Sequence, residues 1–213
     1  MSGRKTREAK ITMQTTGWDE GEASGGVLWM TGLPGAGKST LAQALHRELR
    51  GLGVRSVVLD GDHLRGGLNR DLGFSCRDRF ENVRRVAEVA ALFADAGLIA
   101  IVALVSPLAA MRTQARALVG QRFREVYVNA PLEVCEARDP KGLYRKARAG
   151  RLPEFTGVSA PYEAPGQAEL TLDTANAPLA VCVSDLLQYT LAEFSGAAAT
   201  QPDLRRYLSL ASR

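Results

Sequence analysis

The sequence has few cysteines and no long hydrophobic stretch, and each absence excludes a class of protein. Its three cysteines, Cys76, Cys135 and Cys182, are far apart and form no C-x-x-C pair, which argues against a disulfide framework and against a zinc site. The most apolar run, residues 98–105, is shorter than the roughly 20 residues that span a bilayer, and the N-terminus lacks the apolar core of a secretory signal. These features predict a cytoplasmic protein that does not enter a membrane.

The chain also has little excess charge. Lys and Arg number 27 against 23 Asp and Glu, and the net charge of +4 is too small to indicate nucleic-acid binding. Positive charge is nevertheless concentrated in residues 138–151, which contain six basic side chains and one acidic side chain. Such a density suits small polyanions, although a charge run by itself is more often a solvated helix face.

What the sequence does contain is typical of one globular domain. Hydrophobic residues make up 46% and charged residues 23% of its 213 positions, which argues against a disordered or fibrous chain. The polar, glycine-rich residues 1–25 are expected to form a flexible arm, and residues 26–195 the folded domain. Residues 196–213 are expected to be a linker followed by a short helix over about 203–210.

Short apolar segments alternate with amphipathic ones along the domain. Uniformly apolar strands that alternate with helices of ten or more residues predict an α/β fold, with a mainly parallel sheet covered by helices on both faces. The most regular helix, over 78–96, is expected to have Asp78 as its N-cap and to stop at Gly97. The expected strands cover residues 27–31, 56–59, 98–105, 125–128 and 169–172, and the other helices begin near residues 41, 107 and 178.

A glycine-rich segment between the first expected strand and helix matches the phosphate-loop pattern G-x-x-x-x-G-K-[ST]. Its glycines let backbone N–H groups turn toward a phosphate chain, while Lys38 can reach the β and γ oxygens and Ser39 can bind Mg²⁺. The pattern predicts binding of a nucleoside triphosphate, but motors, switches and metabolite kinases all share it. The nucleotide-binding residues that it predicts are Gly32, Leu33, Pro34, Gly35, Ala36, Gly37, Lys38, Ser39 and Thr40.

Two acidic residues follow the second expected strand. Because the carboxyl ends of parallel strands line the crevice where ligands bind, Asp60 and Asp62 should face the phosphates. Two carboxylates beside a metal-bound triphosphate can hold the metal or orient an attacking hydroxyl. The alternative for Asp60 is that it only caps a turn.

Four blocks of the sequence resemble adenosine 5'-phosphosulfate (APS) kinases, which use ATP to phosphorylate the ribose 3'-hydroxyl of APS. The first block is generic to phosphate loops, whereas the other three are not shared by gluconate, shikimate or nucleotide kinases. The resemblance implies a P-loop NTPase-type three-layer sandwich and a Mg²⁺-dependent reaction that yields 3'-phosphoadenosine 5'-phosphosulfate (PAPS) and ADP. The blocks are residues 32–40, 59–85, 130–150 and 155–174.

The same resemblance implies roles for residues around the transferred phosphoryl group. Asp62 looks like the acid that orients or deprotonates the 3'-hydroxyl and, with Ser39, organises Mg²⁺, whereas Asp60 is expected mainly to shape the turn. Lys141 resembles a catalytic lysine on a lid, and Arg148 resembles a residue that neutralises the nucleotide. A basic lid that closes over both substrates excludes water from the reaction.

On the acceptor side, the resemblance implies that APS is bound by polar and positively charged side chains, by two phenylalanines and by a serine at a strand end. Guanidinium groups suit tetrahedral oxyanions better than ammonium groups do, and two phenylalanines resemble a pair that sandwiches adenine. Ser106 follows the third strand, where the family has a Ser-Pro pair; we expect it to bind at the strand end and the phosphoryl to be transferred directly. The APS-binding residues are therefore expected to be Arg65, Phe74, Arg79, Asn82, Ser106 and Phe155.

Departures from the family pattern occur at His63, Leu108 and Pro153, and they concern acceptor affinity and lid motion rather than the reaction. The resemblance also implies a homodimer and a functional link to the sulfurylase that makes APS from ATP. Two other functions stay open: a phosphate-loop kinase for another small acceptor, and a silent nucleotide-binding domain that regulates a partner. Loss of Lys38 or Asp62 would mark the silent domain, and both residues are present.

Overall fold

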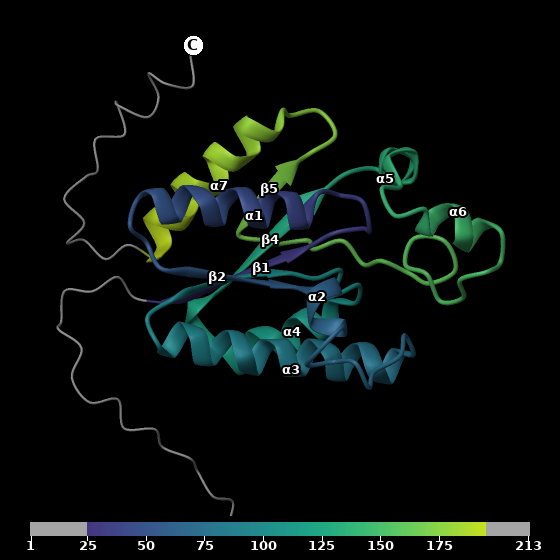
Figure 1. Ribbon diagram of the computed structural model, residues 1–213, viewed down its shortest axis with the longest axis horizontal. Coiled ribbons are helices and arrows are strands. Elements are labelled where there is room, and N and C mark those ends of the chain that lie inside the picture. The colour runs from purple at the N-terminus through teal and green to yellow at the C-terminus, as the bar shows by residue number, and fades with distance from the viewer. Residues whose placement is uncertain (1–24, 195–213) are drawn as a thin grey trace, which may run out of the picture.

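A computed structural model describes residues 25–194, and these residues form a sheet between two layers of helices (Figure 1). All five strands pair in parallel, in the order β2-β3-β1-β4-β5, so β1 is the central strand. The expected α/β sandwich is therefore confirmed. The strands are β1 (Gly26–Thr31), β2 (Ser56–Asp60), β3 (Ile99–Ala103), β4 (Phe123–Asn129) and β5 (Leu170–Asp173).

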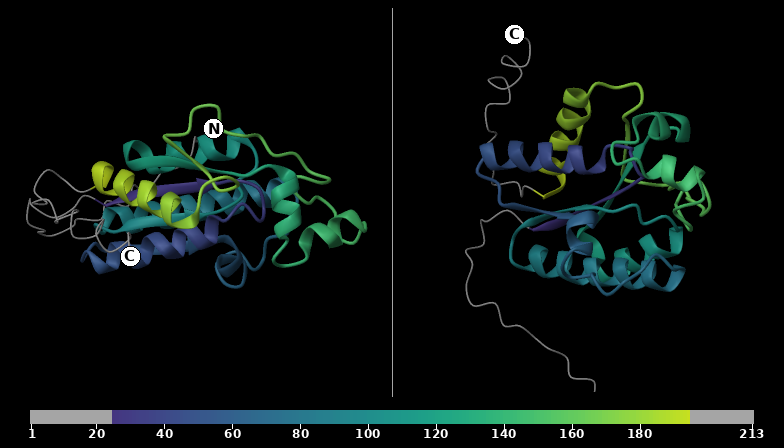
Figure 2. Two further views of the ribbon diagram at one scale, coloured as in Figure 1. Left: turned by 90° about the horizontal axis from the view of Figure 1, so that it is seen from above. Right: turned by 45° about the vertical axis from the view of Figure 1, so that its right-hand side comes forward.

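The long helices divide between the two faces of the sheet. Helices α1 and α7 lie together on one face and α3 and α4 on the other, while the short α5 and α6 lie beyond the carboxyl end of the strands (Figures 1 and 2). A 3₁₀ turn, η1, connects α4 to β4. The helices are α1 (Lys38–Gly51), α2 (Gly61–Arg65), α3 (Cys76–Asp95), α4 (Ala109–Val119), η1 (Gly120–Arg122), α5 (Leu132–Arg138), α6 (Leu143–Arg148) and α7 (Leu179–Phe194).

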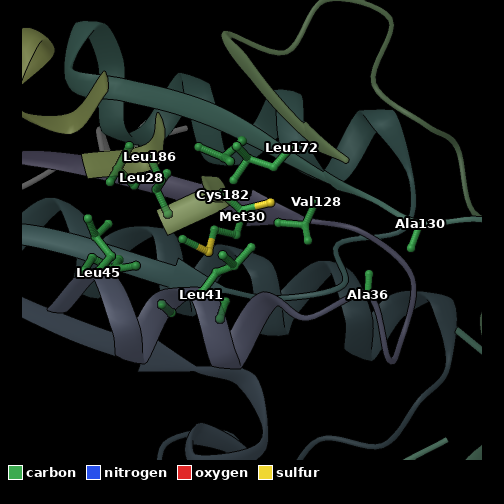
Figure 3. Packing of buried hydrophobic residues seen from close by; sticks show 14 of the residues in the cluster. Leu28, Met30, Ala36, Leu41, Leu45, Val128, Ala130, Leu172, Cys182 and Leu186 are labelled. Atoms are coloured by element: carbon green, nitrogen blue, oxygen red, sulfur yellow. The ribbon is translucent and has the colours of Figure 1, made fainter. Parts of the chain in front are cut away.

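Strand β1 is buried on both faces, and its alternating side chains build two separate cores. Leu28 and Met30 point toward α1 and α7, where they join Leu41, Leu45 and Leu186 (Figure 3). The spacing of the two α1 leucines by four residues places both on one helix face. This packing fixes α1 against β1, and the loop between them therefore has two rigid ends.

The opposite face of β1 packs against α3 and α4. Val27 and Trp29 contact Val86 and Met111 in the second core, and the Trp29 ring also lies 5.7 Å from the ring of Phe123. Burial on both faces explains why the strands read as uniformly apolar rather than alternating.

The element boundaries differ from the sequence-based expectations in two informative places. Helix α3 begins at Cys76, with Ser75 and not Asp78 as its N-cap: the Ser75 hydroxyl accepts a hydrogen bond from the Asp78 amide. The expectation for Asp78 was wrong because Asp78 lies inside the first turn, where its carboxylate accepts hydrogen bonds from the Ser75 hydroxyl and the Gly73 amide. Helix α4 begins at Ala109, two residues later than expected.

The expected C-terminal linker and short helix over 196–213 lie outside the described residues, as does the expected arm over 1–25 except for Gly25. Within residues 25–194, no helix has the length and hydropathy needed to cross a bilayer.

A buried ion pair links α4 to β4. Arg112 is only 4% exposed, its Nε lies 2.6 Å from Glu125 Oε1, and its Nη1 donates to the carbonyl oxygen of Ser106 at 2.9 Å. Without Arg112, the nearly buried Glu125 keeps only the more distant Arg116, whose Nη2 lies 3.6 Å from Glu125 Oε2. We therefore expect Arg112→Met to lower the free energy of unfolding by about 3 kcal/mol, measured by urea denaturation. Arg84→Met, which breaks an exposed ion pair with Glu81, should cost below about 1 kcal/mol. Equal costs for the two variants would contradict this assignment.

Candidate active site

The phosphate loop connects the end of β1 to the start of α1, and its conformation requires glycine. Gly35 has a φ of +81°, and a Cβ there would meet the Cys135 carbonyl oxygen at 2.9 Å. A Cβ on Gly32 would lie 2.4 Å from the carbonyl oxygen of Val128. The loop therefore folds tightly against β4 and α5, in a shape that other residues cannot adopt.

Lys38 is the first residue of α1, and its side chain is folded back onto the loop. Its Nζ donates hydrogen bonds at 2.8 Å to the carbonyl oxygens of Gly32 and Leu33. Burial lowers the pKa of Lys38 to about 8, although the negative charges of Asp60 and Asp62 oppose the shift. The helix has no acidic residue in its first turn and no side-chain cap, so its first amides are available to an anion.

The end of β2 brings an acidic pair against the loop. Asp60 accepts a hydrogen bond from the Asp62 amide at 2.9 Å, which caps α2, and its other oxygen accepts from the Ser39 hydroxyl at 2.5 Å. The turn-shaping role expected for Asp60 is therefore present. Its contact with Ser39 was not anticipated, since nothing in the sequence pairs these two positions.

The Asp62 side chain contacts the segment between α5 and α6 and not Ser39. Its carboxylate forms an ion pair with Lys141, from the connection between α5 and α6, and both side chains are more than half exposed. Two of the expected catalytic residues thus meet directly, although they are 79 positions apart in the chain.

The oxygens of Ser39, Asp60 and Asp62 suit Mg²⁺, which prefers hard oxygen ligands. Among residues 25–194 there is no group of three or more His, Cys, Asp or Glu side chains arranged to hold a metal ion. Magnesium at nucleotide sites generally takes one or two protein oxygens and completes its shell with phosphates and water. The residues present therefore fit a metal that arrives with the nucleotide.

The lid formed by α5 and α6 is anchored on the phosphate loop. The Tyr144 hydroxyl donates to the Pro34 carbonyl at 2.9 Å, and Arg138 Nη1 donates to the Gly35 carbonyl at 3.4 Å. Arg148, an expected nucleotide ligand, makes two hydrogen bonds of 2.9 Å to Glu136. Its role toward the nucleotide stays a prediction, since that contact would compete with Glu136.

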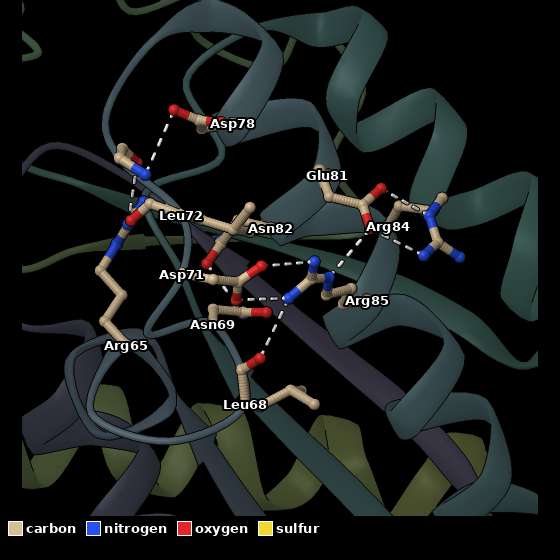
Figure 4. A network of polar contacts seen from close by, with 11 residues as sticks. Arg65, Leu68, Asn69, Asp71, Leu72, Asp78, Glu81, Asn82, Arg84 and Arg85 are labelled. Carbon is tan, nitrogen blue, oxygen red and sulfur yellow. Dashed lines mark hydrogen bonds and ion pairs between the residues drawn. The ribbon is translucent and has the colours of Figure 1, made fainter.

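Four of the six expected acceptor residues lie on α2, on α3 or between them: Arg65, Phe74, Arg79 and Asn82. Figure 4 shows Arg65 and Asn82 in this region. Arg65 lies 4.2 Å from the centre of the exposed Phe74 ring and donates to the carbonyl oxygens of Leu72 and Gly73. Burial lowers the pKa of Arg65, and the positive charge of Arg79 lowers it further. Two guanidinium groups held this close together favour an anion between or beside them.

Asn82 is 6% exposed, and its Oδ1 accepts a hydrogen bond of 2.9 Å from Asn69 Nδ2. Asn69 is fully buried and holds the loop that follows α2, which Arg85 also holds through the Leu68 carbonyl and Asp71 (Figure 4). Sequence reasoning missed Asn69, because a single asparagine in a loop carries no distinguishing pattern.

Phe155 and Ser106, like Asn82, are almost inaccessible to solvent. Phe155 is 8% exposed and packs edge-on against Tyr144 with ring centres 5.0 Å apart, whereas Phe74 is 51% exposed. Ser106 is 3% exposed; its φ is +37° and its hydroxyl accepts from the Trp29 indole at 3.1 Å. The Ser106 hydroxyl is therefore already hydrogen-bonded within the protein. An adenine can reach only a small part of the Phe155 ring.

A hollow of about 530 Å³ lies beside these residues. It is lined by Leu33 of the phosphate loop, Leu132 at the start of α5, and residues 157–162. The Tyr162 hydroxyl lies 3.1 Å from the Thr31 hydroxyl, and its ring stacks on Tyr127, so the segment is tied to the end of β1.

A phosphate loop after β1, an acidic pair at the end of β2 and a basic segment whose Lys141 reaches Asp62 define a P-loop kinase. The profile of the adenylylsulphate kinase family matches residues 24–173. The chain belongs to this family.

Curated relatives and solved structures agree with this assignment. The chain is 58% identical to an adenylyl-sulfate kinase of Shewanella amazonensis over 78% of its own length and 85% of the relative, and 55% identical to one of Paraburkholderia xenovorans over 82% and 98%. The APS kinase of Mycobacterium tuberculosis, solved with AMPPNP and APS, is 45% identical over 78% of this chain and 96% of its own, with a TM-score of 0.75. A sugar kinase from Janibacter at 19% identity shares the fold alone, with a TM-score of 0.54.

Proposed function

We propose a specific role for each of the residues described above in the reaction of the family. This reaction is the phosphorylation of the ribose 3'-hydroxyl of APS by ATP, which gives PAPS and ADP. The observation that carries the proposal is the placement of Asp62. Through Asp60 it is joined to Ser39 beside the phosphate loop, and three residues further along α2 lies Arg65 on the acceptor side. Asp62 therefore stands where a donor phosphate and an acceptor hydroxyl would meet.

On the donor side, residues 32–40 bind the triphosphate of ATP through their amides. Lys38 exchanges its two carbonyl partners for the β and γ oxygens and neutralises the charge that develops during transfer. Arg148 adds positive charge once it leaves Glu136. The concentration of basic residues in 138–151, from the end of α5 through α6, supports a lid over the nucleotide.

Ser39 and Asp62 would hold Mg²⁺, with Asp60 as a third oxygen within reach of Ser39. When bound, the metal would supply positive charge that neutralises the triphosphate. Asp62 orients the 3'-hydroxyl and accepts its proton, for which it must first release Lys141. Lys141 is then free to contact the transferring phosphoryl group.

On the acceptor side, Arg65, Arg79 and Asn82 bind the phosphosulfate, and Phe74 with the accessible part of Phe155 contacts adenine. The exposed ring of Phe74 and the crowding of two guanidinium groups beside it support this assignment. Ser106 contributes its backbone, because its hydroxyl is bonded to Trp29.

We further propose that the protein is a cytoplasmic homodimer that receives APS from ATP sulfurylase. The family resemblance supports the dimer and the link to the sulfurylase, and the scattered cysteines support a reducing compartment.

The acceptor assignment predicts which compound stimulates release of ADP. APS should do so in the presence of Mg²⁺, and AMP, adenosine and gluconate should be turned over at least about 10²-fold more slowly, because they leave the partly buried Arg65 and Arg79 without an anion of the right shape. A coupled ADP assay with each acceptor, repeated with EDTA, measures this. Turnover of gluconate but not of APS would identify another metabolite kinase, and absence of turnover with any acceptor would favour the silent regulatory domain.

A further inference from the structure

Arg79 makes hydrogen bonds to two chain segments that are 75 or more residues apart. Its Nε donates to the carbonyl oxygen of Phe74 at 2.9 Å. On the other side, its Nη2 donates to the carbonyl oxygen of Glu154 at 2.5 Å and its Nη1 to the hydroxyl of Thr156 at 3.3 Å. The two segments are therefore joined through one guanidinium group.

These hydrogen-bond partners lie at, or directly beside, the two phenylalanines Phe74 and Phe155. One bond is made by the backbone of Phe74 itself, and the other two are made by the residues on either side of Phe155. Thr156 is 2% exposed, and Glu154 has a φ of +54°, which L-residues rarely adopt. The far side of the bridge therefore combines a buried hydroxyl, from Thr156, with the conformationally restricted backbone of the exposed Glu154.

A guanidinium group is suited to this task because its donors point in fixed directions within one plane. Three of its five N–H groups are used here, by Phe74, Glu154 and Thr156. One N–H on each terminal nitrogen remains for another ligand. Arg79 can accordingly bind an anion without giving up its protein partners.

We propose that Arg79 is a positioning residue that sets the spacing between Phe74 and Phe155, and so forms the slot that accepts the adenine ring of the acceptor. The inference rests on the proposed function, in which these two rings contact adenine. It adds a role in recognition of the base to the anion-binding role expected for Arg79. The effect acts through the rings and does not depend on the charge of the ligand.

Adenosine separates the two roles, because it carries the base but neither phosphate nor sulfate. We would measure its inhibition constant against APS with ATP saturating, so that it competes only for the acceptor pocket, in Arg79→Lys and Thr156→Val. Lysine keeps the charge but cannot make three divergent bonds. Valine removes one bond of the bridge and leaves Arg79 in place.

The inhibition constant of adenosine should rise about tenfold in Arg79→Lys, the lower end of what the loss of a base-stacking contact costs. It should rise about threefold in Thr156→Val, while the KM for ATP stays within about twofold of wild type in both. Arg77→Lys is the matched control, since Arg77 is exposed on the same turn of α3, and it should change neither constant.

A higher KM for APS with an unchanged inhibition constant for adenosine would overturn the inference and leave Arg79 as an anion ligand alone. Phe74→Ala tests the underlying proposal separately. If it leaves adenosine inhibition unchanged, the adenine contact itself is wrong and the positioning role falls with it. If Arg79→Lys does not fold, Thr156→Val decides alone, because it alters a single side-chain acceptor.

Discussion

Replacing Lys38 by alanine is expected to lower kcat/KM for ATP by about 10³-fold, a loss of about 4 kcal/mol of transition-state stabilisation. The Lys38 ammonium group is the positive charge that the chain itself supplies inside the phosphate loop, and the residue as a whole is 8% exposed. Water cannot replace it well, because the loop encloses Nζ between the carbonyl oxygens of Gly32 and Leu33. Steady-state kinetics with varied ATP and saturating APS measure the effect.

The control is Arg47→Ala, which removes a positive charge from an exposed position nine residues further along α1 and should change kcat/KM less than about twofold. The thermal midpoint of Lys38→Ala should not fall, because the lowered pKa of Lys38 indicates that burial disfavours its charged form. Activity within tenfold of wild type would contradict the proposed role of the loop lysine.

Replacing Asp62 by asparagine is expected to lower kcat by about 10²-fold or more, while the KM for ATP stays near that of wild type. Asparagine keeps the size of the side chain, and the backbone bond from residue 62 to Asp60 remains. It cannot accept a proton from the 3'-hydroxyl, nor can it form an ion pair with Lys141. Single-turnover measurements with enzyme in excess separate the chemical step from product release.

Asp185→Asn, on the exposed face of α7, removes one carboxylate far from the lid and should leave kcat unchanged. An unchanged kcat in Asp62→Asn would remove Asp62 from the chemistry and leave its contact with Lys141 as a surface ion pair. Such pairs between exposed groups contribute little to stability, so the free energy of unfolding of Lys141→Ala would then stay within about 1 kcal/mol of that of wild type.

The sequence predicts the layers and the phosphate loop because both depend on local patterns. Uniformly apolar segments such as residues 98–105 indicate strands that are covered on both faces, and the spacing of Leu41, Leu45 and Leu49 indicates one apolar helix face. The resemblance to APS kinases extends this to residues that no local pattern connects, such as Asp62 and Lys141.

The parts that could not be predicted are hydrogen bonds from side chains to residues far away in the sequence. The bond from Trp29 to Ser106 and the bridge from Arg79 to Glu154 cross more than 70 positions, and both end on a residue with positive φ. Neither the periodicity nor the spacing of these residues distinguishes them from ordinary core or surface positions. The prediction of the α3 N-cap was wrong for a different reason. Serine and aspartate are both good N-cap residues, and only the hydrogen bonds between Ser75 and Asp78 show that Ser75 is the cap.

Because Lys38 Nζ already donates hydrogen bonds to two backbone carbonyl oxygens, it must exchange these oxygens for phosphate oxygens when the nucleotide binds. An ammonium group shielded from water must keep oxygen neighbours at all times, and here the backbone holds that place until phosphate arrives. Affinity therefore reflects the difference between two sets of oxygens and not the full strength of either. The phosphate loop therefore keeps a defined shape between turnovers. Any change that strengthened the hydrogen bonds from Lys38 to the two carbonyl oxygens would lower the affinity for the nucleotide.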